Sequence, residues 1–243
     1  MLNGIDFHLI NPTESGNIGA CARALKNMGF DQLHLLEPHA QLDAGAFARA
    51  SGADDLLLRA QSHTQLNKQL SQYHWVVGTT MQTTSHAHKA ISMEYFVQQV
   101  TQRTSQNQRI AVLFGTESSG LTNQQLDHCQ ATLSIPCSNA FSSLNLSHAV
   151  QIIAYEARKA MLGLSATQPS SGVMPATHED IQRMVDFIEQ RLTDKRYLAP
   201  EKQNKYMRHI KNIFHQSQMS KQQAQLFMGM LRGLVGKNQS ETD

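Results

Sequence analysis

Three stretches of the chain combine glycines and small polar residues with side chains that can bind anions or can donate and accept protons. Residues 11–19, 114–121 and 135–147 carry or precede the candidate groups Asn17, Arg23, Glu117, Ser143 and Asn145. A guanidinium can bind an anion, a carboxylate can accept a hydrogen bond from a hydroxyl group and position it, and glycines let a ligand approach the backbone. Each stretch follows a predicted strand, the end at which open α/β sheets bind ligands, so we expect one shared site.

Taken singly, the three stretches match no simpler catalytic motif. Residues 16–19 (GNIG) form neither a dinucleotide-binding fingerprint nor a P-loop, and Glu117 stands where a nucleophile elbow has its Ser. Each group also has a structural explanation. Asn17 could cap a helix, Arg23 could form a surface ion pair, Glu117 could lie near the start of a helix capped by Thr122 and Gln125, and Ser142 or Ser143 could cap the long helix.

The elements that must position these groups alternate between strands and helices. Apolar runs predict strands at residues 5–10, 33–36, 75–78, 110–115 and 133–136, and helical spacing predicts helices at 18–28, 44–50 and 144–162. This alternation indicates an α/β domain with a largely parallel sheet over residues 1–163.

The last third of the chain has a different character. Residues 164–177 are rich in Ser, Thr, Pro and Gly, which indicates a linker, and Thr177 with Asp180 predicts the start of a new helix. Helices expected at 179–193, 201–215 and 221–235 would form a small all-α extension spanning residues 178–243.

Positive charge is concentrated in this extension. Residues 195–237 contain nine Lys and Arg and one acidic residue, a net charge of +8 in a chain whose total is +2. Lys205, Arg208 and Lys211 recur every three residues, after Lys202, and fall on one helical face; the opposing apolar stripe is Met207, Ile210, Ile213 and Phe214. A solvated face is the alternative, but the charge imbalance favours an anionic partner, and we expect this partner to be nucleic acid.

Composition excludes several classes. The chain has 243 residues, 40% hydrophobic and 16% charged, which is typical of a globular protein. No apolar run could span a membrane, no signal peptide is visible, and three cysteines without a CxxC pair favour a reducing cytoplasm. His86 and His88 lack nearby Cys or acidic partners, so we expect no metal site, and Cys137 is interpreted as a small packed residue.

Together the three stretches resemble the three motifs of the SpoU/TrmH branch of the SPOUT methyltransferases, over residues 1–163. Their patterns are N-x-G-x-x-x-R-x-A, G-x-E-x-x-G-L and P-x-x-x-x-x-S-L-N-x-S. The corresponding residues are Asn17, Gly19, Arg23 and Ala24; Gly115, Glu117, Gly120 and Leu121; and Pro136, Ser143, Leu144, Asn145 and Ser147. This chain departs from the first pattern in that Ala24 directly follows Arg23, and from the third by one additional residue between Pro136 and Ser143.

The resemblance implies a fold with a deep trefoil knot, a homodimer, and S-adenosylmethionine as the methyl donor. By position, the cofactor pocket would be lined by Thr79, Thr80, Met81, Gly115, Ile135, Ser142, Ser143 and Leu144. Arg23 would act at the ribose 2′-hydroxyl, Asn17 would orient the loop or the RNA, and Glu117 would hold Arg23 or Asn17. Ser143 and Asn145 would fix the cofactor and the knot loop.

The extension resembles that of the branch that methylates the first pyrimidine of the tRNA anticodon loop, nucleotide 32. Its matching positions are Phe187, Leu192, Pro200, Ile210, Phe214 and Leu231 to Gly233. The resemblance therefore implies a cytoplasmic tRNA 2′-O-methyltransferase. The alternatives are the same chemistry on ribosomal RNA and an inactive RNA-binding protein on this fold; the missing G-x-G-x-x-G disfavours a nucleotide-dependent oxidoreductase.

Overall fold

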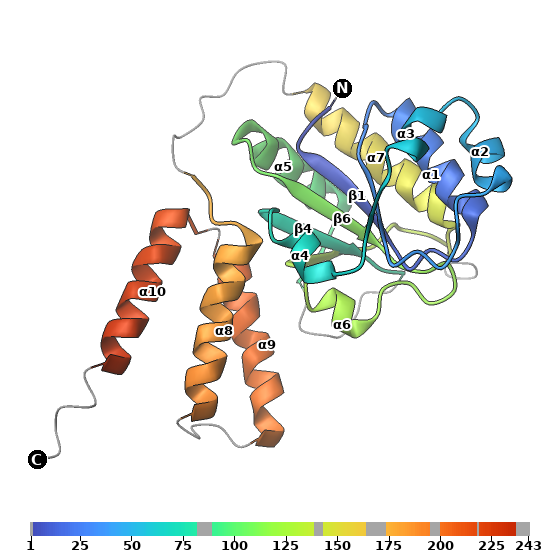
Figure 1. Cartoon of the computed structure of the whole chain (residues 1–243). Helices are drawn as coiled ribbons and strands as arrows, with labels where there is room; N and C mark the ends of the chain where they lie inside the picture. The colour runs from blue at the N-terminus through green and yellow to red at the C-terminus, as the bar shows by residue number, and fades with distance from the viewer. Residues whose placement is uncertain are drawn as a thin grey trace, which may run out of the picture. The chain divides into compact units, whose positions relative to one another are not determined.

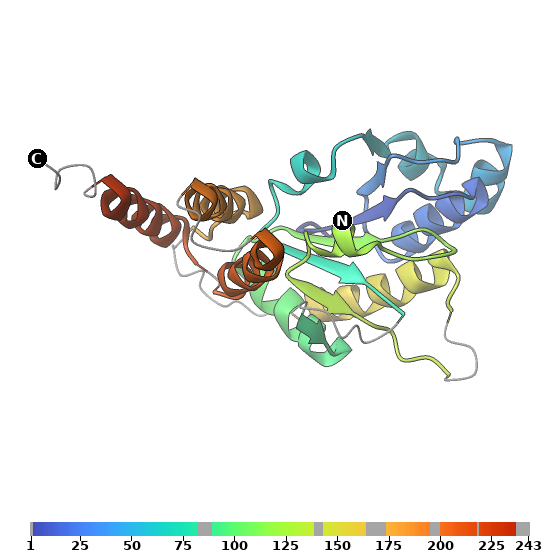
Figure 2. The same cartoon turned by 90° about the horizontal axis from the view of Figure 1, so that it is seen from below.

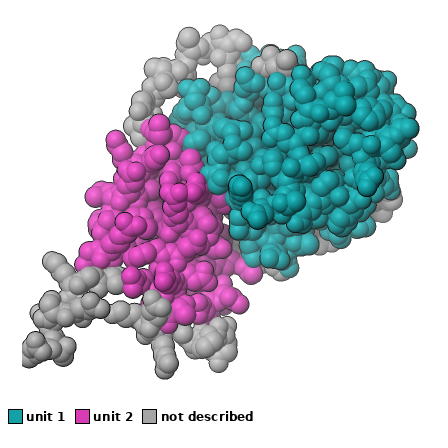
Figure 3. Space-filling view, viewed as in Figure 1, with its two compact units in different colours: residues 1–171 teal, residues 172–243 magenta. Residues whose placement is uncertain are grey.

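The computed structural model describes residues 2–81, 89–138, 143–163, 174–194, 200–217 and 219–236 (Figure 1). Two compact units make up the chain, residues 1–171 and residues 172–243 (Figure 3). None of the helices in these described ranges is both long and apolar enough to cross a membrane.

The first unit is built on a parallel sheet of seven described strands. Their order is β3-β2-β1-β6-β4-β7-β5, and every neighbouring pair is parallel. The strands are β1 (Ile5–Ile10), β2 (Leu33–Leu36), β3 (Gln61–His63), β4 (Trp75–Thr79), β5 (Lys89–Ile91), β6 (Ile110–Phe114) and β7 (Ala131–Leu133). The predicted α/β class with a parallel sheet is confirmed.

Helices cover both faces of the sheet because its central strands are apolar on both sides. In β6, Val112 and Phe114 belong to one buried cluster and Ala111 and Leu113 to the other. The first cluster packs against α1 (Ser15–Asn27), α2 (Ala44–Ala50), α3 (Asp54–Leu58), α5 (Met93–Ser105) and α7 (Leu146–Leu162). The second packs against α4 (Leu66–Leu70) and α6 (Asn123–Leu126). Figure 2 shows α5 and α7 on the same side of the strands.

The structure corrects several predicted boundaries in this unit. The strand expected at 133–136 is β7, which ends at Leu133 before Pro136. The long helix begins at Leu146, and its cap is Asn145, whose side chain accepts a hydrogen bond from the Ser147 N–H. Ser143 is therefore not the cap that was predicted, and Ser142 lies outside the described residues. The predicted capping box of Thr122 and Gln125 is present at α6.

The described part of the second unit contains three helices around its own apolar cluster. They are α8 (His178–Asp194), α9 (Pro200–Gln216) and α10 (Lys221–Gly236). Met184, Val185 and Met207 are buried at the centre of the cluster. Thr177 and Asp180 form the predicted pair at the start of α8: the Asp180 N–H donates to the Thr177 hydroxyl, and the carboxylate accepts in return.

Candidate active site

The carboxyl ends of three neighbouring strands position the candidate site. β6, β4 and β7 are consecutive in the sheet, so the segments that follow them emerge at the same edge. Thr79 at the end of β4 donates from Oγ1 to the carbonyl of Leu113 over 2.9 Å, and the Thr80 N–H donates to the carbonyl of Leu133 over 3.0 Å. These bonds hold the end of β4 against both neighbouring strands.

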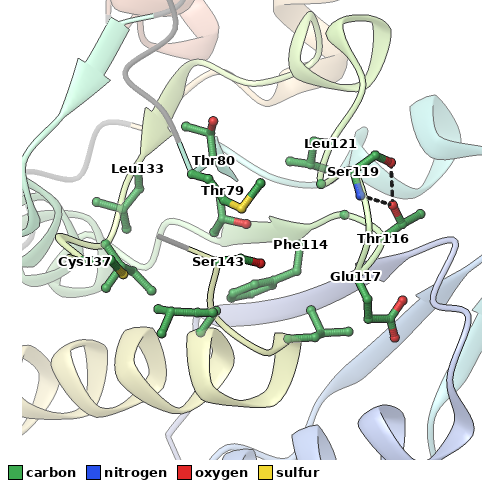
Figure 4. Close-up of a pocket in the computed structure, with 17 residues that line it drawn as sticks. Thr79, Thr80, Phe114, Thr116, Glu117, Ser119, Leu121, Leu133, Cys137 and Ser143 are labelled. Atoms are coloured by element: carbon green, nitrogen blue, oxygen red, sulfur yellow. Dashed lines mark hydrogen bonds between the residues drawn. The ribbon is translucent and has the colours of Figure 1, made fainter. Parts of the chain in front are cut away.

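A cavity of about 250 Å³ opens at this edge (Figure 4). It is bounded by the ends of the three strands and by the start of α7. Its lining residues are Thr79, Thr80, Met81, Phe114, Gly115, Thr116, Glu117, Ser119, Gly120, Leu121, Leu133, Ile135, Cys137, Ser143, Leu144, Leu146 and Ala149.

The walls of this cavity are mixed in character. Phe114 and Leu133 are buried apolar side chains, whereas Thr79 and Ser143 contribute hydroxyl groups (Figure 4). Leu146 adds a third buried apolar side chain. Apolar walls with a few placed polar groups are the usual composition of small-molecule sites. The cavity therefore suits a ligand that has both a flat apolar part and hydrogen-bonding groups.

Gly115 lets the loop after β6 close on itself. A Cβ atom at this position would lie 2.0 Å from the carbonyl carbon of Gly120 and 2.2 Å from the Leu121 nitrogen, both backbone atoms. Thr116 and Gly120 exchange backbone hydrogen bonds across the turn, and Gly120 adopts a φ of +69° that favours glycine. The two glycines are thus required by the shape of the loop that forms one wall of the cavity.

Glu117 connects this loop to the loop after β1. Its carboxylate accepts hydrogen bonds from the Thr13 N–H (3.1 Å), the Thr13 hydroxyl (2.7 Å) and Nδ2 of Asn17 (3.0 Å). Partial burial raises the pKa of Glu117, but the hydrogen bonds from Thr13 and Asn17 outweigh it, and the pKa is lowered from its ordinary value. Glu117 is therefore ionised at neutral pH and acts as an acceptor.

Asn17 extends this connection to the third motif. Its Oδ1 accepts a hydrogen bond from Nδ2 of Asn145 over 3.0 Å, and Oδ1 of Asn145 accepts from the N–H and hydroxyl of Ser147. Asn17 is 3% exposed, so both of its amide groups depend on these partners. One continuous chain of hydrogen bonds thus joins the three predicted motifs.

Arg23 lies apart from the cavity. It is exposed on α1, six residues beyond Asn17, and lines a separate shallow groove of about 520 Å³ between α1, α2 and α7. The other residues of this groove are Ala20, Ala24, Asn27, Ala48, Arg49, Ser147, His148 and Gln151. Within a single chain, Arg23 therefore does not reach the cavity that the other motif residues line.

Comparison with known proteins identifies the family. The model of the SpoU rRNA methylase family matches residues 5–155. The chain belongs to the SpoU rRNA methylase family. It is 33% identical over 248 residues to the tRNA (cytidine/uridine/adenosine-2′-O-)-methyltransferase TrmJ of Pseudomonas aeruginosa, which covers 98% of this chain and 95% of that protein. The prediction of an RNA methyltransferase of this family is confirmed.

Solved structures agree with this assignment. The crystal structure of TrmJ from Z. mobilis ZM4 has a TM-score of 0.80 at 25% identity and covers 95% of this chain and 98% of that one. The SpoU methyltransferase AviRb from Streptomyces viridochromogenes, in complex with AdoMet, has a TM-score of 0.52 at 23% identity. It covers 67% of this chain and 60% of that one, and shows a shared fold.

The structure of this SpoU chain brings together most of the residues predicted to bind a cofactor. Seven of the eight line the cavity: Thr79, Thr80, Met81, Gly115, Ile135, Ser143 and Leu144. The eighth, Ser142, lies outside the described residues, as do His86 and His88. Of the two partners predicted for Glu117, the structure shows Asn17 and not Arg23. Cys137, expected to be a small packed residue, is only partly buried and lines the cavity.

Sequence reasoning missed Thr13, which donates twice to Glu117. The available signal was its position in the loop after β1, because β1 pairs with β6 and the two loops emerge side by side. Thr116 and Ser119, whose hydroxyls lie 2.8 Å apart in the cavity wall, were also missed as individual residues.

The predicted basic stripe of this SpoU chain lies on α9. Lys205 is exposed and Arg208 and Lys211 are half-buried, while Met207 and Phe214 pack inside the second unit. Ile213, predicted to belong to the packed stripe, is 65% exposed; its position lies between the two faces of the helix. The side chain of Lys202 lies outside the described residues.

Proposed function

We propose that the chain transfers the methyl group of S-adenosylmethionine to the ribose 2′-hydroxyl of a pyrimidine in the tRNA anticodon loop, at nucleotide 32. The observation that carries the proposal is the cavity at the ends of β4, β6 and β7, lined by the predicted cofactor residues and tied to all three motifs by hydrogen bonds. The full-length likeness to a TrmJ tRNA 2′-O-methyltransferase supports tRNA as the substrate.

The chemistry of the cavity fits this cofactor. Phe114, Leu133 and Leu146 offer apolar surface for an adenine ring. The turn from Gly115 to Leu121 contributes backbone groups where a Cβ atom would collide with the chain. Backbone N–H and C=O groups can recognise the edge of an adenine, and the hydroxyls of Thr79 and Ser143 can bind a ribose or a carboxylate.

When bound, S-adenosylmethionine supplies an activated methyl group, so we propose that transfer needs no metal. The protein must hold the 2′-oxygen in line and help it lose its proton. A guanidinium stays protonated at neutral pH, so Arg23 stabilises the developing negative charge on the oxygen and binds the adjacent phosphate. Glu117, Asn17 and Asn145 act as positioning residues, because their hydrogen bonds fix the loops around the cavity.

We propose that the active form is a homodimer. Arg23 lines a groove separate from its own chain's cavity, so a second subunit is needed for it to meet bound cofactor. Exposed apolar side chains on α7 support such an interface: Tyr155 is 50% exposed and Leu162 is 51% exposed. The trefoil knot, expected around the segment that carries the third motif, belongs to the same proposal.

We propose that the second unit binds tRNA through the basic stripe of α9. Lys205, Arg208 and Lys211 place positive charge on one face while the other face packs into the unit. Neutralising phosphates in this way adds affinity without reading the sequence, which suits a module that delivers a folded RNA to a separate catalytic unit.

Methyl transfer from radiolabelled S-adenosylmethionine tests the proposal directly. Unmodified total tRNA and ribosomal RNA serve as parallel substrates, and nuclease-resistant 2′-O-methyl positions are then mapped. Label at nucleotide 32 of tRNA is the expected result. Label on ribosomal RNA alone would show that ribosomal RNA, and not tRNA, is the substrate. Cofactor binding without transfer to either RNA would indicate an inactive RNA-binding protein.

A further inference from the structure

Two arginines of the first unit lack the partners that the others have. The unit contains six arginines, and four of them bind a carboxylate, an amide or a backbone carbonyl: Arg59, Arg103, Arg109 and Arg158. Arg23 and Arg49 form no hydrogen bond or ion pair with any residue that the structure describes, and both line the groove between α1, α2 and α7.

Close packing of α2 on α1 brings Arg49 to this groove. A Cβ atom at Gly19 would lie 1.9 Å from the carbonyl oxygen of Ala46, so the two helices touch backbone to backbone. Arg49 follows on the same short helix, and its side chain lies over Gly16, with Cδ and Nε 2.9 Å from where a Cβ atom would stand. The absence of side chains at Gly19 and Gly16 thus leaves room for α2 to pack on α1 and for the Arg49 side chain to lie across the start of α1.

Arg49 belongs to the last turn of α2, and its side chain crosses the start of α1. The start of a helix carries partial positive charge, and the first turn of α1 contains no acidic residue. Two nearby carboxylates have other partners: Asp43 accepts from Ser15 (2.6 Å) and from the Ala46 N–H (3.0 Å), and Glu14, the N-cap of α1, accepts from Nδ2 of Asn17 (3.3 Å). Arg49 forms an ion pair with neither carboxylate in the described part of the chain, so its guanidinium is placed to meet an anion from outside the chain.

The groove is suited to a phosphodiester. No Asp or Glu is present among the residues that line it, and the side chains of Asn27, His148 and Gln151 add polar groups around the two guanidiniums. A planar guanidinium binds two phosphate oxygens at once. The groove is also wide and shallow, which fits an extended backbone rather than an enclosed small molecule.

We infer that Arg49 binds a phosphate of the RNA substrate adjacent to the nucleotide on which Arg23 acts. Arg49 is then a positioning residue: it sets the register of the RNA backbone and leaves the methyl-transfer step to the motif residues. The inference rests on the proposed function and adds to it a substrate contact that lies outside the three motifs.

The test compares full-length Arg49→Gln with the wild type in methyl transfer to tRNA. Loss of one charged phosphate contact should raise KM for tRNA about tenfold and leave kcat and the Kd of S-adenosylhomocysteine within about twofold. The slope of log Kd against log salt for tRNA should fall by about one. Arg49→Lys should recover part of the affinity. The matched control is Arg59→Gln, which removes an exposed guanidinium already paired with Asp55 and should change neither quantity.

Other outcomes would overturn the inference. An unchanged KM and salt slope would show that Arg49 makes no RNA contact, and a lower kcat at constant KM would assign it to the chemical step. A change in sedimentation from dimer to monomer would show that the groove is an interface between subunits. If the wild type methylates no RNA, the proposed function fails by that result alone, while the salt slope of tRNA binding still tests Arg49.

Discussion

Asn145 donates a hydrogen bond from Nδ2 to Oδ1 of Asn17 over 3.0 Å, although the two residues are 128 positions apart in the chain. The other end of the Asn17 amide donates to Glu117. A single buried side chain therefore fixes the start of α1 against both the loop after β6 and the cap of α7. A primary amide carries a donor and an acceptor on one planar group, so it can satisfy both neighbours at once.

Replacing this amide should therefore destabilise the first unit. Asn17→Ala leaves Glu117 and Asn145 short of one partner each, which should lower the free energy of unfolding by about 1–3 kcal/mol. Urea unfolding at pH 7 measures the change. Asn27→Ala, an exposed position on the same helix, is the matched control and should have little effect. Equal stability of Asn17→Ala and wild type would show that the hydrogen bonds of Asn17 to Glu117 and Asn145 do not contribute to the free energy of unfolding.

Two glycines of α1 should respond differently to the same substitution. Gly19→Ala would place a Cβ atom 1.9 Å from a backbone oxygen of α2, which has no freedom to move without displacing that helix. We expect a loss of about 1–3 kcal/mol or more in the free energy of unfolding. Gly16→Ala meets only the flexible side chain of Arg49 and should be nearly neutral. The thermal unfolding temperatures of the two variants are compared. If α1 tolerated alanine at neither position, both variants would be destabilised alike, whereas a backbone contact at Gly19 alone predicts that only Gly19→Ala is destabilised.

The sequence predicted the strands that carry the site because each is a short apolar run closed by glycine or a polar loop. β4 and β6 were predicted within a residue of their true ends. The strand expected at 133–136 was misplaced because Leu133 and Ile135 are both apolar, whereas pairing with β4 stops at Leu133. α5 was overlooked although Ser92 caps it and Phe96 and Val100 mark its buried face, a signal that was present in the sequence.

The candidate site could be predicted as a set of residues but not as a set of contacts. Spacing identified Glu117 and Asn17, yet their pairing depends on β1 and β6 lying side by side, which no local pattern encodes. The same limit explains why Arg23 was expected near Glu117. Both belong to motifs, but the direction of α1 carries Arg23 away from the cavity, about 9 Å further along the helix axis than Asn17.

Arg23→Ala should separate catalysis from cofactor binding. Arg23 does not line the cavity of its own chain, so the Kd of S-adenosylhomocysteine measured by calorimetry should change less than about twofold. Methyl transfer to tRNA should fall by at least about a hundredfold, because charge on the 2′-oxygen loses its stabilising group. Arg59→Ala removes a paired arginine of the same unit and serves as the control. Full activity of Arg23→Ala would remove this residue from the mechanism.

Acid should destabilise the first unit through His34. This residue is buried on β2, between β1 and β3, on the face of the sheet that α4 covers. Burial lowers the pKa of His34 to about 4, an effect that Asp6 opposes only in part. Because the unfolded chain binds the proton near pH 6.5 and the folded chain does not, stability is lost as pH falls from 6.5 towards 4. The loss from this group between pH 7.5 and pH 5 should be about 2 kcal/mol.

The measurement is the free energy of unfolding in urea at the two pH values. His34→Gln, which keeps a polar side chain beside Gln69 and His63, should show a smaller loss between them than the wild type. His39→Gln, at an exposed position of the same unit, should show the wild-type loss. An identical pH dependence in His34→Gln and the wild type would rule out His34 as its source.

The basic stripe of α9 should contribute to tRNA affinity through counterion release. Changing Lys205, Arg208 and Lys211 to Gln removes three positive charges from one face and leaves the buried Met207 and Phe214 in place. The slope of log Kd against log salt should fall by about 2–3 if all three contact phosphates. Methyl transfer at saturating tRNA should remain close to the wild-type rate, because the stripe acts on binding.

A matched triple variant decides whether the fall in the salt slope of tRNA binding depends on the position of the charges or on the total charge of the chain. Lys26, Arg59 and Lys159 lie in the first unit, and each is paired with a carboxylate. Changing these three to Gln lowers the net charge by the same amount, yet it should alter the salt slope far less, because their charges are already compensated locally. Equal losses in the two triple variants would mean that tRNA responds to the overall charge of the chain, and the stripe would then have no specific role.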